Sequence, residues 1–179
     1  VVGEAIGNMF PARISAGTRT FPQLGFNRLI IRKDGKARES WIGDEHYNVE
    51  NPERIPFGPV DPEVGVIKVE DNARAIVMSY AMHADLGCFS YEISADYPGY
   101  ACRKVEEAFD NKAICLFVAG GGGNVEGLMI SRRRSGPNDP IKTDYKPIQR
   151  TGELLGIEVI KLANALHASG DNTSFKMRT

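Results

Sequence analysis

The chain has little cysteine, and that scarcity excludes two kinds of small stabilised protein. It contains 3 cysteines in 179 residues, and none of them form a C-x-x-C pair. Neither a disulfide framework nor a four-cysteine zinc site is therefore predicted. Cys88, Cys102 and Cys115 are interpreted as small hydrophobic residues that pack in the interior.

The chain also lacks an excess of either charge and any long hydrophobic run. Lysine and arginine number 22 and aspartate and glutamate 23, so the formal net charge is −1, which gives no general reason to bind nucleic acid or an anionic membrane. The basic run Arg132–Arg134 has no interleaved aromatic residues and is interpreted as a solvated or internally paired loop. The apolar stretches Ala75–Met82 and Ala113–Ala119 are far shorter than the roughly 20 residues of a membrane span. No nucleic-acid partner and no membrane span are expected, and composition leaves the compartment and the oligomeric state undefined.

What the chain does contain predicts one α/β domain over residues 1–179. Hydrophobic residues make up 42% of it, which is enough for one core in a chain of single-domain length. The residue patterns predict strands over 12–17, 29–32, 64–70, 74–82 and 113–119, and helices in the first ten residues and over 96–110 and 148–168. This order predicts a mixed β-sheet covered by helices. Strands 64–70 and 74–82 are expected to form a hairpin, and 113–119, apolar on both faces, to be a central buried strand.

Two polar or glycine-rich regions are expected to be loops. Asp34-Gly35 predicts a tight turn after strand 29–32, and residues 34–63 predict a long ordered loop. Gly120–Gly123 follows strand 113–119, at the edge of the sheet where α/β proteins bind ligands. The loop lacks both the P-loop Lys-Ser/Thr pair and the G-x-G-x-x-G pattern, so nucleotide binding is not predicted. Close approach to another ligand and a pure packing role both remain open.

His83 directly follows strand 74–82 and is the candidate metal ligand. If strands 74–82 and 113–119 are neighbours, His83 lies beside the glycine loop, and a neutral imidazole there could bind zinc. A single histidine without a companion at metal-binding spacing is a weak signal, so a structural or capping role is the alternative. His46 and His167 are interpreted as solvated, and Asp96 as a helix cap.

Several motifs in these regions resemble one protein family. Gly58–Val66 (G-P-V-D-P-E-V-G-V), Tyr80–His83 (Y-A-M-H) and Ile93–Ala101 (I-S-A-D-Y-P-G-Y-A) are similar to segments of the N-terminal domain of neutral/alkaline non-lysosomal ceramidases. The resemblance is greatest to their shorter bacterial relatives of unassigned substrate, and Gly123–Glu126 fits the same pattern. It covers nearly the whole chain, with the motifs in the family's order.

The resemblance implies a zinc-dependent hydrolase that cleaves an amide (C–N) bond of a small molecule. In the family, a histidine at the position of His83 is a zinc ligand. The family's Asn-Arg motif, matched by Asn27-Arg28, places an arginine near the substrate, so Arg28 is expected to stabilise the oxyanion and Asn27 to contact the substrate. Gly123 and Asn124 are likewise expected to be substrate-binding residues.

The chain departs from the family at the position of the catalytic serine, which here is Glu126. A carboxylate does not replace a hydroxyl nucleophile directly, but it can act as general base for a water molecule. Glu126 is therefore the candidate base or substrate contact, and a site inactive toward ceramide is the alternative.

The family's other zinc ligands, a second histidine, a glutamate and a tyrosine, have no match in this chain. Residues 1–179 therefore resemble a central section of a larger ceramidase-like domain, incomplete at both ends, with Thr173–Lys176 as the start of a further strand. One histidine does not hold zinc tightly, so the remaining ligands are expected outside this chain. Two other hypotheses stay open, a non-catalytic domain that binds a small ligand at Gly120–Gly123 and a structural domain of a larger assembly.

Overall fold

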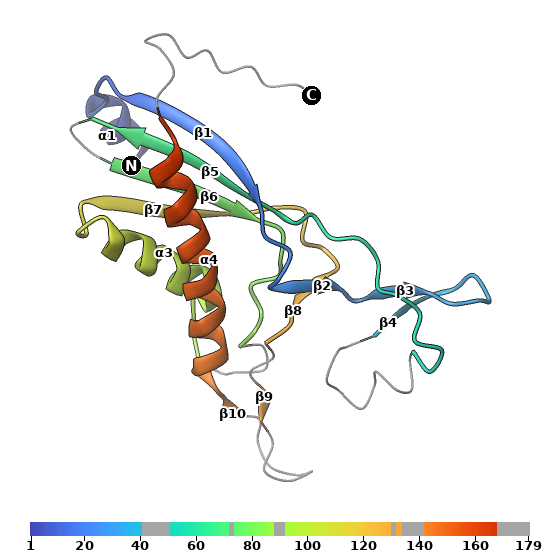
Figure 1. The fold of residues 1–179 in the computed structure, drawn as a ribbon. Coiled ribbons are helices and arrows are strands. Elements are labelled where there is room, and N and C mark those ends of the chain that lie inside the picture. Colours follow the sequence, from blue (N-terminus) through green and yellow to red (C-terminus); the bar gives the residue numbers. More distant parts are fainter. Residues whose placement is uncertain (41–50, 72–73, 88–91, 130–131, 134–141, 168–179) are drawn as a thin grey trace.

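The computed structural model describes residues 1–40, 51–71, 74–87, 92–129, 132–133 and 142–167. Its helices are α1 (Val2–Gly7), α3 (Asp96–Ala108) and α4 (Tyr145–Ala165). Its strands are β1 (Arg13–Thr20), β2 (Gly25–Asn27), β3 (Leu29–Ile31), β4 (Ala37–Glu39), β5 (Glu63–Glu70), β6 (Arg74–Tyr80), β7 (Ala113–Ala119), β8 (Val125–Gly127), β9 (Arg132–Arg133) and β10 (Lys142–Thr143). Figure 1 shows α3 and α4 against one face of the main sheet and the short strands beyond its end.

The main sheet has four strands in the order β1-β5-β6-β7. β1 and β6 both pair antiparallel with β5, whereas β7 runs parallel to β6. α3 lies in the crossover between the two parallel strands, which a β-hairpin turn could not connect. The predicted α/β class with a mixed sheet is confirmed, and so is the predicted hairpin, which consists of β5 and β6.

The prediction that 113–119 is a central strand is wrong. This segment is β7, and among the described strands it pairs with β6 alone, at the edge of the sheet. Cys115 faces the helices and is buried, but Ile114, Leu116 and Val118 are 65%, 53% and 52% exposed on the opposite face. Helices α3 and α4 cover one face, and within the described part of the chain no layer covers the other. An apolar pattern on both faces of a strand therefore did not indicate its place in the sheet.

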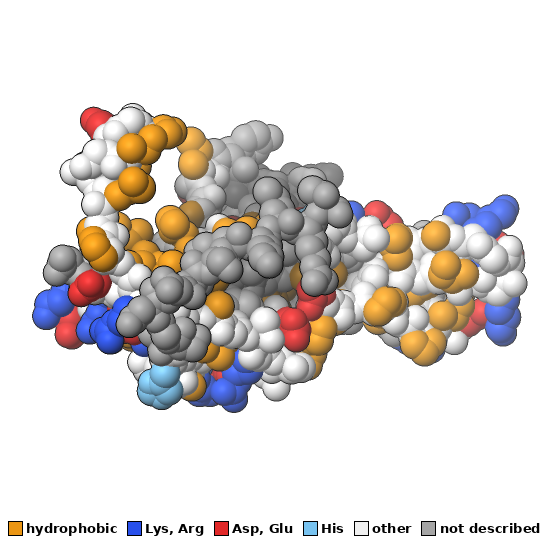
Figure 2. Space-filling view, turned by 90° about the horizontal axis from the view of Figure 1, so that it is seen from above, with side chains coloured by type: hydrophobic (Ala, Val, Ile, Leu, Met, Phe, Trp, Pro, Cys, Tyr) orange, Lys and Arg blue, Asp and Glu red, His pale blue; other side chains and the backbone are white. Residues whose placement is uncertain are grey.

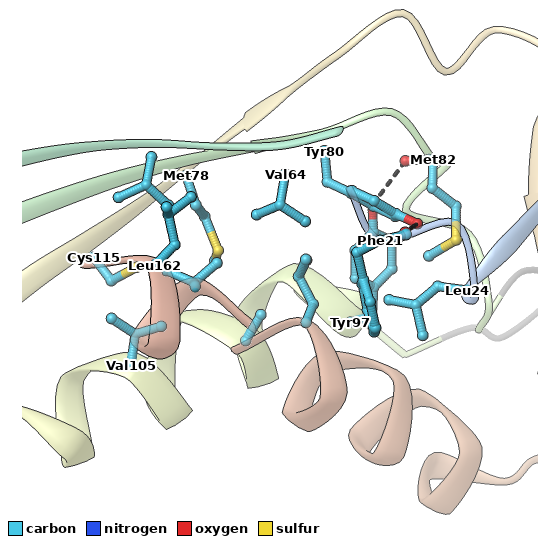
Figure 3. Packing of buried hydrophobic residues seen from close by; sticks show 14 of the residues in the cluster. Phe21, Leu24, Val64, Met78, Tyr80, Met82, Tyr97, Val105, Cys115 and Leu162 are labelled. Atoms are coloured by element: carbon cyan, nitrogen blue, oxygen red, sulfur yellow. Dashed lines mark hydrogen bonds between the residues drawn. The ribbon is translucent and has the colours of Figure 1, made fainter. Parts of the chain in front are cut away.

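The core lies between the sheet and the two long helices (Figure 3). The helix predicted over 148–168 is confirmed as α4, and the residues at helical spacing along its inner face, Leu155, Val159, Leu162 and Ala163, are buried. α4 starts three residues before the predicted Ile148, since the Asp144 side chain accepts the Lys146 N–H and caps the helix. α3 and α4 pack closely: a Cβ at Gly152 would lie 2.4 Å from the Tyr97 carbonyl oxygen.

The short strands form separate pairs, β2 with β8, β3 with β4 and β9 with β10. β3 and β4 form a projecting arm (Figures 1 and 2) and confirm the predicted turn, at which Gly35 has a φ of 76°. Part of the predicted loop 34–63 lies outside the described residues, as do His46 and the expected strand Thr173–Lys176. No helix in the described ranges is long and apolar enough to cross a membrane.

Candidate functional site

The pairing of β2 with β8 joins two parts of the chain that are almost one hundred residues apart. Phe26 lies opposite Glu126 in this pair, and the Arg28 N–H donates to the Asn124 carbonyl at 2.9 Å. The backbones come close at Gly25, where a Cβ would lie 2.9 Å from the Glu126 carbonyl oxygen. Sequence patterns did not predict these three-residue strands. Their pairing places the side chains of Arg28 and Glu126 next to each other.

Arg28 and Glu126 form an ion pair between the Arg28 Nη1 and the Glu126 Oε1. The Glu126 side chain is 4% exposed and that of Arg28 19%, so water screens this pair little. The Arg28 Nε also lies 3.3 Å from the Glu39 Oε1, on a side chain that is 54% exposed. Glu39 was not predicted as a site residue. The sequence feature that could have revealed it is the Asp34-Gly35 turn, because the hairpin formed by that turn places Glu39 opposite Leu29, the residue after Arg28.

His83 and Asp85 lie in the segment after β6, close to the pair formed by Arg28 and Glu126. The His83 N–H donates to the Val125 carbonyl at 2.9 Å, which attaches the loop after β6 to β8. β6 ends at Tyr80, two residues earlier than predicted, and His83 lies beside β8, the strand that follows the glycine loop. Asp85 follows His83 in the same loop. Its Oδ1 is buried and has no hydrogen-bond partner among the described residues.

The surroundings raise the pKa of the Glu126 carboxyl above its ordinary value. The largest cause is burial, which disfavours the charged form, and the second is the nearby negative charge of Asp85. Arg28 and His83 act in the opposite direction, and they keep the pKa from rising further. The four side chains therefore form one electrostatically coupled cluster around a carboxyl group that takes up a proton more readily than a solvated glutamate.

Two buried side chains hold the loop that carries His83. The Tyr97 hydroxyl donates to the carbonyl of Met82 at 2.8 Å (Figure 3). Asp96, interpreted from sequence as a helix cap, is instead the first residue of α3, because Ala95 occupies the cap position. Its φ is 50°. Its carboxylate accepts the N–H of Tyr97 at 2.7 Å and that of Gly87 at 2.8 Å. Asp96 thus connects the start of the helix to the loop, because each of its two carboxylate oxygens accepts a backbone N–H.

The glycine loop combines packing positions with open ones. A Cβ at Gly122 would lie 2.9 Å from the Met82 backbone nitrogen, and one at Gly120 would lie 3.2 Å from Ala81. At Gly121 and Gly123 a Cβ would meet nothing within 4 Å. Two of the glycines therefore allow the loop to pack against the backbone before His83, and the other two leave backbone accessible.

The residues expected to contact substrate differ in their hydrogen bonds and in their exposure. The Asn27 side chain donates to the Pro59 carbonyl at 2.8 Å and accepts the Leu29 N–H at 3.0 Å, so it orders the surrounding backbone. Gly123 and Asn124 are exposed. The substrate-binding roles of Asn27, Gly123 and Asn124 remain predictions.

The described residues do not complete a metal site. Among them, no group of three or more histidine, cysteine, aspartate and glutamate side chains is placed to hold a metal ion. Zinc in proteins is usually bound by three or four such ligands. His83 fits as one ligand at most, and His167 is exposed after the end of α4, as interpreted from sequence.

Comparison with known proteins identifies the fold. No protein-family model matches the chain, and no curated protein matches it. The solved structure of neutral ceramidase from Pseudomonas aeruginosa is similar, with a TM-score of 0.61 at 15% identity, over 94% of this chain and 26% of that chain. A ceramidase complexed with C2 matches with a TM-score of 0.58 at 16% identity, over 92% of this chain and 23% of that chain. The chain spans about a quarter of the length of these structures, and it has the fold of part of a ceramidase chain.

Proposed function

We propose that this chain carries part of the active site of a ceramidase-like hydrolase that cleaves an amide C–N bond in a small molecule. The observation that supports the proposal most is the buried Glu126 carboxyl, which lies against Arg28 and close to His83 and Asp85. A carboxyl group with a raised pKa, next to a cation and in a water-poor site, suits proton transfer. The fold, similar to part of a ceramidase, agrees with this chemistry.

In the proposed mechanism Glu126 is the general base. Its carboxylate takes a proton from a water molecule while the water oxygen attacks the amide carbonyl carbon. Proton uptake neutralises Glu126, so the positive charge of Arg28 is no longer balanced by this partner. The same charge then stabilises the negative oxygen that develops on the former carbonyl. The proton held by Glu126 is afterwards donated to the leaving amine nitrogen, which returns the carboxylate to its starting state.

Zinc dependence is part of the proposal. His83 would supply one ligand, and the others would come from residues outside the described ranges. Bound zinc in such sites lowers the pKa of water and polarises carbonyl groups.

Metal analysis and an amide assay on the complete gene product, purified without added metal, test the proposal together. We expect about one zinc per chain in the parent protein, its loss in His83→Ala, and hydrolysis of N-acyl amides that a chelator abolishes. Glu126→Gln should reduce the rate by about 100-fold or more, the usual contribution of a general base. Glu39→Gln is the matched control, because it removes the other, exposed partner of Arg28 and should leave the rate within a few-fold.

The outcomes separate the hypotheses. A protein without zinc that still hydrolyses amides would overturn the metal-dependent part alone. A protein that binds an amide but does not turn it over, with Glu126→Gln unchanged in affinity, would favour a binding domain that uses the exposed backbone of Gly121 and Gly123.

A further inference from the structure

Cys102 and Cys115 come from adjacent elements and meet inside the molecule. Cys115 lies on the face of β7 that points toward the helices, where it belongs to the core (Figure 3). Cys102 of α3 is partly buried and packs against that core. Glu106 fixes their alignment. It follows Cys102 by one helical turn, and its carboxylate accepts the Cys115 N–H at 3.0 Å. Helix α3 is therefore attached to β7 at Cys115, by a residue that lies one turn from Cys102.

The two thiols differ in acidity and in exposure. The interaction with Cys115 lowers the pKa of the Cys102 thiol, whereas the interaction with Cys102, together with burial, raises the pKa of the Cys115 thiol. Cys102 is also partly exposed, whereas Cys115 is buried. Thiolate character and access both control the reactivity of cysteine toward disulfides. On both counts Cys102 is the thiol that a reagent from solution reaches first.

We propose that Cys102 and Cys115 form a reversible disulfide by exchange with a low-molecular-weight disulfide such as oxidised glutathione. The Cys102 thiolate attacks one sulfur of oxidised glutathione, so that a mixed disulfide forms and one glutathione thiolate leaves. The Cys115 thiol then loses its proton and its sulfur attacks the Cys102 Sγ, which expels the second glutathione. Two protein thiols are oxidised and one glutathione disulfide is reduced to two thiols.

The cross-link would join α3 to the edge strand of the sheet. β7 runs directly into Gly120–Gly123 and then into β8, which carries Glu126. Oxidation would therefore fasten the strand that leads to the candidate site onto the helix behind it. A disulfide also reduces the entropy of the unfolded chain, so the oxidised protein should melt at a temperature higher by roughly 5 °C.

Peptide mapping of the unmodified protein tests the pairing directly. The protein is equilibrated with oxidised glutathione, alkylated without reduction and cut after glutamate, and Glu92 and Glu106 then separate Cys88, Cys102 and Cys115 onto three peptides. The expected product is a cross-link between the Cys102 and Cys115 peptides that disappears on reduction. Absence of this cross-link, or pairing of either residue with Cys88 instead, overturns the proposal.

Two variants test the assigned order of attack. In Cys115→Ser, Cys102 should take up one glutathione and keep it, because the resolving thiol is gone. In Cys102→Ser, Cys115 should stay unmodified over the same time while the protein is folded, as judged by an unchanged circular dichroism spectrum. Equal glutathione uptake in the two variants overturns the assignment of Cys102 as the first thiol to react.

Discussion

At the scale of single residues, the pair formed by Arg28 and Glu126 dominates the candidate site. A buried carboxylate with one close cation depends on that cation, since removal of one partner leaves an uncompensated charge in a poorly solvated place. Asp85 increases this dependence because it adds a second negative charge nearby. Arg28 therefore has a structural role in the folded protein in addition to any role in catalysis.

Replacement of Arg28 by alanine should destabilise the protein much more than loss of its exposed partner. We expect Arg28→Ala to lower the free energy of unfolding by about 3 kcal/mol, and Glu39→Gln to change it by less than about 1 kcal/mol because Glu39 is 54% exposed. Urea unfolding of the three proteins measures both effects. Similar losses in the two variants would contradict the buried pair as the stronger interaction.

The titration of Glu126 should also make the free energy of unfolding depend on pH. Its folded pKa is raised above the ordinary value of 4.5, so between these two values the folded state binds more protons than the unfolded state. In that pH window the contribution of Glu126 to the free energy of unfolding falls as pH rises. We therefore measure the free energy of unfolding of the parent protein and subtract that of Glu126→Gln at each pH. This difference should decrease from pH 4.5 upward and then level off. A difference that grows with pH would show a lowered pKa instead.

At the scale of elements, the glycine loop shows how close packing and an open surface alternate along four residues. The loop follows β7, and its second and fourth positions are open, whereas Gly120 and Gly122 contact the backbone at the end of β6. Because β6 and β7 are parallel neighbours, this contact brings the segment after β7 against Met82, the residue before His83. The loop thus helps to determine where His83 lies.

Alanine at Gly122 and alanine at Gly123 should have different effects on stability. At Gly122 the new Cβ would lie 2.9 Å from a backbone nitrogen, so the expected loss is about 1–3 kcal/mol. At Gly123 a Cβ meets nothing within 4 Å and the backbone has no positive φ, so the change should stay within roughly 0.5 kcal/mol. Thermal unfolding of both variants checks this, and equal destabilisation would contradict the assigned packing.

At the scale of the whole molecule, the main sheet has one covered and one uncovered face among the described residues. On the uncovered face, an apolar hollow of about 450 Å³ lies over β1, β5 and β6, and it reaches Val118 of β7. β7 is a seven-residue apolar edge strand with no charged residue. Such an edge is a known liability for association between chains.

Polar substitution on this face should affect association more than folding. Leu116→Thr should change the free energy of unfolding by less than about 1 kcal/mol, because Leu116 is half exposed, and it should reduce concentration-dependent self-association. Ile76→Thr, at a fully buried position of β6, should cost more than about 2 kcal/mol. Urea unfolding and sedimentation velocity of both variants test this, and a large loss of stability in Leu116→Thr would contradict an uncovered face.

Local sequence patterns were sufficient to predict the fold class of the chain and most of its long helices and strands. The helical stripe of α4, the hairpin of β5 and β6 and the turn at Gly35 each depend on neighbours within a few residues, so periodicity and turn chemistry predicted them. The metal-ligand role of His83 and the roles of Asn27, Gly123 and Asn124 stay predictions, because they depend on molecules or residues beyond the described ones.

Other features required the assembled molecule, because they arise from contacts between distant segments. The edge position of β7 depends on which strands pair and which face the helices cover, and its two-sided apolar pattern is compatible with either place. The cluster of Arg28, Asp85 and Glu126 forms when the three-residue strands β2 and β8 pair, and such short strands have no periodicity to detect. The raised pKa of Glu126 follows from burial and from charges brought together by that pairing, so no sequence pattern contains it.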